Sequence, residues 1–112
     1  MSRREVTGKR PLEYSKFHRE HLPRWCYMTD IDAVEWREGR GIVALIETAD
    51  IRSKCDRDWQ LRVLKELSRR SGIPAYFVRH DRECTIFVVE RLDGPGYWVM
   101  NREEYKRFLR EL

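Results

Sequence analysis

The sequence predicts one α/β domain in which a mixed central sheet is flanked by helices. Segments with an apolar residue at every third or fourth position alternate with short runs of β-branched and aromatic residues, which is typical of helices interspersed with strands. A length of 112 residues suits a single hydrophobic core and is too short for two domains. The run at residues 42–46 is apolar throughout, which indicates a central strand covered on both faces.

The composition is that of a globular chain with a heavily charged surface, because 38% of the residues are charged and 41% are hydrophobic. The net charge of +4 is a mild basic excess that suits a polyanionic partner such as nucleic acid. Three widely spaced cysteines indicate neither a disulfide framework nor a zinc knuckle, so we expect a reducing cytoplasmic location. The charged first residues do not resemble a signal peptide, and no run approaches membrane-spanning length, so we expect no membrane partner.

The first part of the chain is predicted to contain a basic arm, a helix and a short strand. Residues 1–11 show no apolar period, and we expect a flexible arm that either contacts phosphate groups or only solubilises the terminus. The cations of this arm are Arg3, Arg4, Lys9 and Arg10. Residues 12–112 form the single predicted domain, which begins with an amphipathic helix over residues 12–22 that carries Glu20. Residues 24–28 are then predicted to form a short strand.

A β-hairpin is predicted over residues 30–50, where two strand-like runs flank a short polar segment with two glycines. If the turn is centred between residues 39 and 40, antiparallel pairing gives Asp32 opposite Glu47, Val34 opposite Leu45 and Trp36 opposite Val43. A slip of one residue would set Asp30 opposite Glu47 instead. Two facing carboxylates repel each other, so the pair is either half of a divalent-metal site or a strand end exposed to solvent.

A second helix is predicted over residues 57–71, with Gly72 as its stop signal. Its core stripe consists of Leu61, Leu64 and Leu67. Gln60 lies on the same side near the helix start, where its amide needs a partner, either in a functional site or at a backbone carbonyl. The opposite face is basic and includes Arg62, so it is either a solvated face or a ridge that contacts phosphates.

The remaining residues are predicted to complete the sheet and to add a third helix. Residues 73–78 form a strand that returns to the sheet after the helix, and a charged turn at residues 79–82 leads into a strand at residues 84–89. A tight loop at residues 92–96 then precedes a last strand at residues 97–100. Asn101, with Glu104 three residues later, is typical of a capping box and predicts a terminal amphipathic helix.

Taken together, these features resemble the PD-(D/E)xK nuclease superfamily in its small resolvase-like form. The resemblance covers residues 13–79 and rests on the Asp at the head of one hairpin strand, the apolar run that ends in Glu47, and the helix entered through Gln60. It implies a restriction-endonuclease-like αβββαβ core, here followed by extra C-terminal strands and a helix.

The resemblance also implies a site. In that superfamily the Asp and the Glu hold Mg²⁺ or Mn²⁺ on a phosphodiester, and a lysine two residues after the Glu orients the attacking water. Two carboxylates suit Mg²⁺, which keeps several of its waters. The implied metal ligands here are Asp32 and Glu47, with Asp30 and Glu20 as further candidates, and Gln60 belongs to the catalytic set. The lysine position is occupied by Ala49, and Lys54 is the nearest substitute.

The implied function is metal-dependent hydrolysis of DNA phosphodiester bonds, on branched or structured DNA. The alternative is a nuclease-like fold that has lost cleavage and binds nucleic acid or a protein partner, and the alanine at position 49 favours it. A third interpretation is a structural interaction protein with no nucleic-acid role. Small nucleases often pair to cut two strands, so a homodimer is one arrangement that the resemblance allows.

Overall fold

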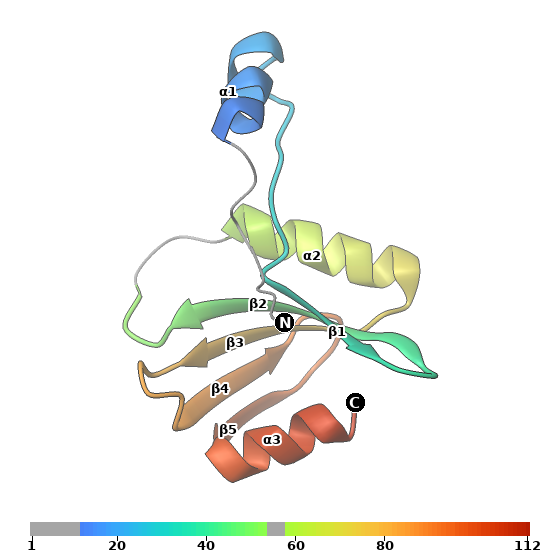
Figure 1. The fold of residues 1–112 in the computed structure, drawn as a ribbon, viewed down its shortest axis with the longest axis vertical. Coiled ribbons are helices and arrows are strands. Elements are labelled where there is room, and N and C mark those ends of the chain that lie inside the picture. The colour runs from blue at the N-terminus through green and yellow to red at the C-terminus, as the bar shows by residue number, and fades with distance from the viewer. Residues whose placement is uncertain (1–11, 54–57) are drawn as a thin grey trace.

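A five-stranded mixed sheet with one helix against each face forms the body of the protein (Figure 1). The computed structural model describes residues 12–53 and 58–112. The elements in chain order are α1 (Leu12–His21), β1 (Ala33–Arg37), β2 (Gly41–Asp50), α2 (Asp58–Ser71), β3 (Ala75–His80), β4 (Ile86–Arg91), β5 (Tyr97–Asn101) and α3 (Arg102–Arg110). The predicted α/β class and the mixed sheet are therefore confirmed.

The strands follow one another in the sheet in the order β1-β2-β3-β4-β5. All neighbours are antiparallel except β2 and β3, which are parallel and are joined through α2. This arrangement confirms the predicted return of the chain to the sheet after the second helix. The two strands after β3 and the terminal helix are the predicted C-terminal additions.

The predicted strand at residues 24–28 is wrong, so only two strands precede α2 among the described residues. The segment begins instead with a turn in which the Cys26 backbone N–H donates to the Pro23 carbonyl. Trp25 is 79% exposed, and the ring of Tyr27 meets Trp59 of α2 edge-on at 5.3 Å between centroids. The β-forming residues of this segment therefore contact a helix and solvent, whereas a strand needs a neighbouring strand to pair with.

The hairpin has the predicted register over its first half. Ala33 pairs with Ile46 and Val34 with Leu45, as expected. An irregularity between Glu35 and Trp36 then shifts the pairing by one residue, so that Trp36 faces Ile42 rather than Val43. Such a bulge leaves one extra residue on the longer strand and changes the register only on its far side.

Strand β2 contributes side chains to a separate hydrophobic cluster on each face of the sheet. On one face, Ala44 and Ile46 belong to a cluster against which α3 packs, with Phe87 and Tyr105 stacked at 4.0 Å. On the other face, Leu45 packs with Leu64 of α2. Residues 42–46 lie in a strand with a neighbour on each side, as predicted, but the predicted cover on both faces holds only for residues 44–46, because Ile42 is 49% exposed. Helix α3 begins with the predicted capping box at Asn101.

Helix α1 lies apart from the sheet, as Figure 1 shows at the top of the view, and it contacts no other described helix or strand. Its aromatic side chains, Tyr14 and Phe17, are about half exposed. No helix among the described residues combines the length and the apolar character needed to cross a membrane.

Leu64 is expected to be the main anchor of α2, because it is 3% exposed, whereas Leu67 is 39% exposed and lies at the margin of the predicted stripe. We expect Leu64→Ala to lower the free energy of unfolding by about 2–5 kcal/mol, through lost burial and the cavity that remains. Leu67→Ala is the matched control and should cost less than about 1 kcal/mol. Urea unfolding measures both, and equal losses would contradict this packing.

Candidate functional site

Several of the predicted site residues lie near the carboxyl end of β2. The parallel strands β2 and β3 end side by side there, with Asp50 paired to His80. The chain passes from Asp50 over residues 51–57 into the first turn of α2, so the start of this helix returns to the same end of the sheet (Figure 1). The ends of parallel strands are the usual place for sites in sheets of this class.

Asp32 immediately precedes β1, and its side chain accepts hydrogen bonds from β2. Its Oδ2 accepts hydrogen bonds from the Thr48 backbone N–H at 2.9 Å and from the Thr48 hydroxyl at 3.1 Å. These two bonds fix the orientation of the carboxylate. No donor within residues 12–53 and 58–112 lies within hydrogen-bond distance of the other oxygen, Oδ1, which leaves that atom able to meet a cation.

Glu47 lies on β2 and is only 4% exposed. Side chains alternate between the two faces of a strand, so Glu47 shares the α2-facing side with Leu45 and Ala49. The observed pair Ala33–Ile46, continued by one residue, sets Asp32 level with Glu47 across the hairpin. A carboxylate buried to this extent requires a cation, a proton or hydrogen-bond donors close by.

Gln60 is half-buried in the first turn of α2 and finds its partner in the segment before the hairpin. Its Nε2 donates to the hydroxyl of Thr29 at 3.4 Å. The prediction that this amide needs a partner is confirmed, and the partner is a side chain rather than a backbone carbonyl. This hydrogen bond joins the start of α2 to Thr29, the residue that precedes Asp30 in the chain.

The other predicted ligands are less well placed. Asp30 is half-buried beside Thr29, but Glu20 is exposed on α1, which contacts no other described helix or strand. Across the described part of the chain there is no group of three or more His, Cys, Asp or Glu residues arranged to hold a metal ion. The structure therefore does not bring the four predicted acids together as one ligand set. The correction applies first to Glu20, because the apolar side of α1 has no partner that would hold this helix against the sheet.

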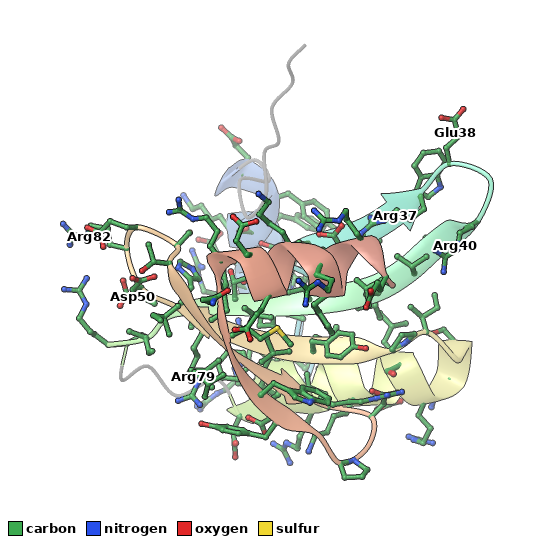
Figure 2. The ribbon with its side chains drawn as sticks, turned by 90° about the horizontal axis from the view of Figure 1, so that it is seen from below. Arg37, Glu38, Arg40, Asp50, Arg79 and Arg82 are labelled. Atoms are coloured by element: carbon green, nitrogen blue, oxygen red, sulfur yellow. The ribbon has the colours of Figure 1, made fainter. Side chains whose placement is uncertain are left out.

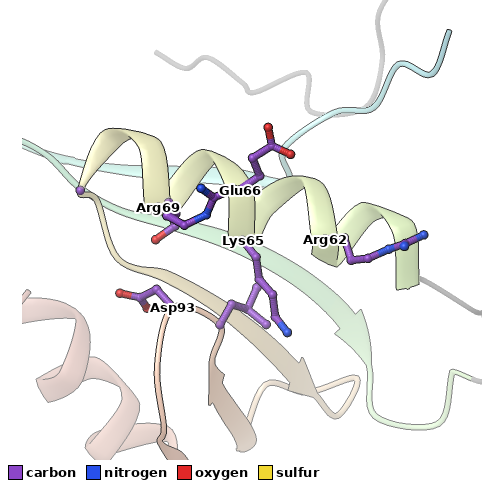
Figure 3. A pocket seen from close by; sticks show the side chains of 8 residues that line it. Arg62, Lys65, Glu66, Arg69 and Asp93 are labelled. Atoms are coloured by element: carbon purple, nitrogen blue, oxygen red, sulfur yellow. The ribbon is translucent and has the colours of Figure 1, made fainter.

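The cations predicted to bind nucleic acid lie partly outside the described residues. Lys54, Arg3, Arg4, Lys9 and Arg10 belong to the segments that the structure does not describe. Arg62 is exposed on α2 and forms a row with Lys65 and Arg69, three and four residues apart on one side of the helix. This basic row, with Asp93 opposite, borders an open pocket of about 660 Å³, which Figure 3 shows.

One cation at this end of the sheet was not predicted. Strand β3 continues to His80, two residues beyond its predicted end, and the parallel pairing sets Arg79 beside Ala49. The charged residues from position 79 onward predicted a turn, so Arg79 was not expected to lie in the sheet. A predicted strand two residues longer, parallel to β2, would have included Arg79.

Comparison with known protein families, curated proteins and solved structures finds no match for this chain. The chemistry available to the site is therefore that of its own residues. These are two carboxylates at the head of the hairpin and on β2, one amide from α2, and a cation from β3.

Asp50, the last residue of β2, is expected to stay charged to low pH. The Arg52 side chain and then its backbone N–H hydrogen-bond to the carboxylate, and they lower the pKa of Asp50 from 3.8 to about 2. A carboxyl group whose pKa is lower in the folded protein stabilises it above the unfolded pKa, and this stabilisation is lost as the pH falls from about 4 through 2. NMR titration of the carboxyl carbons should give this value, and Arg52→Ala should raise it toward 3.8.

Asp81 provides an internal control in the same spectra. Its pKa is also lowered to about 2, but mainly by the Thr85 hydroxyl, so it should not change in Arg52→Ala. A pKa of Asp50 near 3.8 in the unmodified protein would show that the Asp50–Arg52 pair does not persist in solution.

Proposed function

We propose that this protein is a metal-dependent endonuclease that hydrolyses DNA phosphodiester bonds, with Asp32 and Glu47 as the metal ligands. The observation that carries the proposal is the hairpin register. Pairing of Ala33 with Ile46 sets Asp32 level with Glu47, which is buried within β2 three residues before the strand ends. A cation bound between two acids at the same level of a hairpin would offset the repulsion between them, so this register supports a metal-binding role.

The donor set fits a hard divalent cation. Carboxylate oxygens are the ligands that Mg²⁺ prefers, and one or two of them suffice because the ion keeps several waters. Thr48 holds the Asp32 carboxylate through Oδ2, as outer hydrogen bonds commonly do for metal ligands, and Oδ1 faces no donor in the described residues. When bound, Mg²⁺ or Mn²⁺ would polarise the phosphoryl group and lower the pKa of an attacking water.

Helix α2 supplies the contacts to nucleic acid in this proposal. Its basic row of Arg62, Lys65 and Arg69 is exposed, and cations spaced along one side of a helix can contact successive phosphates. Gln60 lies on the opposite, sheet-facing side of the same helix, so the row contacts the phosphate chain at a distance from the acids. Branched or structured DNA is the proposed substrate, and a homodimer would place one site on each strand of a duplex.

Ala49 favours a second function, which is binding of nucleic acid without cleavage. Its methyl group is buried on the same face as Glu47 and supplies no charge where the superfamily pattern has a lysine. The two functions differ in one measurable respect, because only the nuclease converts its substrate in a metal-dependent way.

A cleavage assay separates them. Labelled duplex, single-stranded and four-way-junction DNA are incubated with Mg²⁺, with Mn²⁺ or with EDTA. We expect metal-dependent cutting that falls at least about 100-fold in Asp32→Asn and in Glu47→Gln, because a bound ion supplies several kcal/mol of charge stabilisation and each 1.36 kcal/mol is a factor of ten. Glu38→Gln is the matched control, since this exposed acid lies in the hairpin turn at the far end of the sheet (Figure 2).

The outcomes are distinct. Salt-dependent binding with no cutting on any substrate would favour the binding module. Cutting that persists in both Asp32→Asn and Glu47→Gln would show that the site lies elsewhere. Circular dichroism of each variant confirms that it is folded, and sedimentation of the same samples shows whether the active species is a homodimer.

A further inference from the structure

We infer that Arg79 binds the phosphate group next to Glu47 and supplies the cation that is missing at Ala49. This inference deepens the proposed function and rests on it. It assigns to a residue of β3 the place that the superfamily pattern gives to a lysine of β2.

The parallel register puts Arg79 on the correct face of the sheet. Glu47 pairs with Phe77 and Ala49 pairs with Arg79. Paired residues of neighbouring strands point to the same face, and so do residues two apart in one strand. Glu47, Ala49 and Arg79 therefore all lie on the side of the sheet that faces α2. Figure 2 shows Arg79 on the α2 side of the end of the sheet that also carries Asp50.

The guanidinium of Arg79 turns back toward the level of Glu47. Its central carbon lies 5.9 Å from the centroid of the Phe77 ring, and Phe77 is the register partner of Glu47. Arginine favours such a position over an aromatic face. The side chain of Ala49 is a single methyl group. It therefore leaves room above position 49 for the side chain of the neighbouring Arg79.

Arg79 also has a hydrogen-bond donor in need of an acceptor. Its Nε is fully buried and has no hydrogen-bond partner within residues 12–53 and 58–112. A buried donor without an acceptor is rare and unfavourable in folded proteins. Because this Nε is closed to solvent, an incoming phosphate oxygen would meet the outer nitrogens of the guanidinium, which bind such oxygens strongly.

The chemistry of arginine limits what Arg79 does there. A guanidinium stays protonated at all physiological pH values, so it does not take a proton from the attacking water. It donates hydrogen bonds to the phosphate oxygens and stabilises the charge that develops on them. Arg79 therefore binds and stabilises the phosphate, and a bound metal would supply the lowered pKa of the attacking water.

The test uses Arg79→Ala, Arg79→Lys and the double variant Arg79→Ala with Ala49→Lys. We expect Arg79→Ala to lower metal-dependent cleavage about 100-fold, the effect of removing one donor to a developing negative charge. Lys at position 79 should retain part of the activity, and Lys at position 49 should restore most of it, because it returns a cation to the same face. Arg82→Ala is the matched control, because Arg82 is exposed at the same end of the sheet but on the α3 side (Figure 2).

A second measurement does not depend on cleavage. In EDTA, the slope of log affinity for duplex DNA against log salt concentration should become shallower by about 0.9 in Arg79→Ala, the contribution of one phosphate contact. It should stay unchanged in Arg82→Ala. Thermal unfolding shows whether Arg79→Ala is folded, and Arg79→Lys, which keeps a cation, is the comparison if it is not.

Failure of the inference and failure of the proposed function give different results. If Asp32→Asn and Glu47→Gln abolish cleavage while Arg79→Ala cuts DNA normally with an unchanged slope, Arg79 has no such role and the nuclease stands. Lost cleavage in a folded Arg79→Ala that Ala49→Lys does not restore would also overturn the placement. If the unmodified protein cuts nothing, the proposed function fails, and the salt slope alone then supports or overturns the phosphate contact of Arg79.

Discussion

The burial of β2 on both faces is the constraint on which the rest of the structure depends. Ala44 and Ile46 face the α3 side while Leu45 and Glu47 face the α2 side, so neither face can shift without exposing apolar residues. Side chains alternate with a period of two, and a slip of one residue would exchange the two faces completely. The registers of β1 and β3 are therefore fixed relative to β2, and with them the positions of Asp32 and Arg79.

This rigidity explains how the chain can hold an acid in a largely apolar place. Glu47 lies one residue beyond Ile46, in a strand whose other residues already specify its position. Burying a carboxylate disfavours the folded state unless its charge is compensated by a cation, a proton or hydrogen-bond donors. Residues held in unfavourable surroundings by a well-packed scaffold are typical of functional sites.

Compensation across neighbouring strands is a general possibility in such sheets. Ala49 and Arg79 are thirty positions apart in the sequence but adjacent in the parallel ladder. A cation needed beside one strand can therefore be carried by the paired residue of the neighbouring strand, provided that the residue it pairs with has a small side chain. Motifs defined by spacing along one strand do not detect this exchange, because the relevant neighbour is set by pairing.

The sequence by itself determined the elements whose signals are local. Glycines at the hairpin turn, the apolar run of β2, the stop signal after α2 and the capping box at Asn101 each specify structure within a few residues, and the pair Val34–Leu45 followed from them. The same reasoning predicted that Asp32, Glu47 and Gln60 form a group at one end of the sheet. Their role as a metal site remains a prediction.

Only the tertiary structure decided the features that depend on a distant partner. Residues 24–28 have strand-forming side chains but no described strand beside them, and Glu20 lies on a helix that contacts no other described helix or strand. Leu67 has helical spacing from Leu64 but lies beyond the edge of the surface that α2 covers. Arg79 lies in β3 because β2 offers pairing partners as far as Asp50, so that β3 extends through residues whose charge alone predicts a turn. Periodicity specifies which side of an element is apolar, whereas the extent of burial and pairing depends on what the rest of the chain places against it.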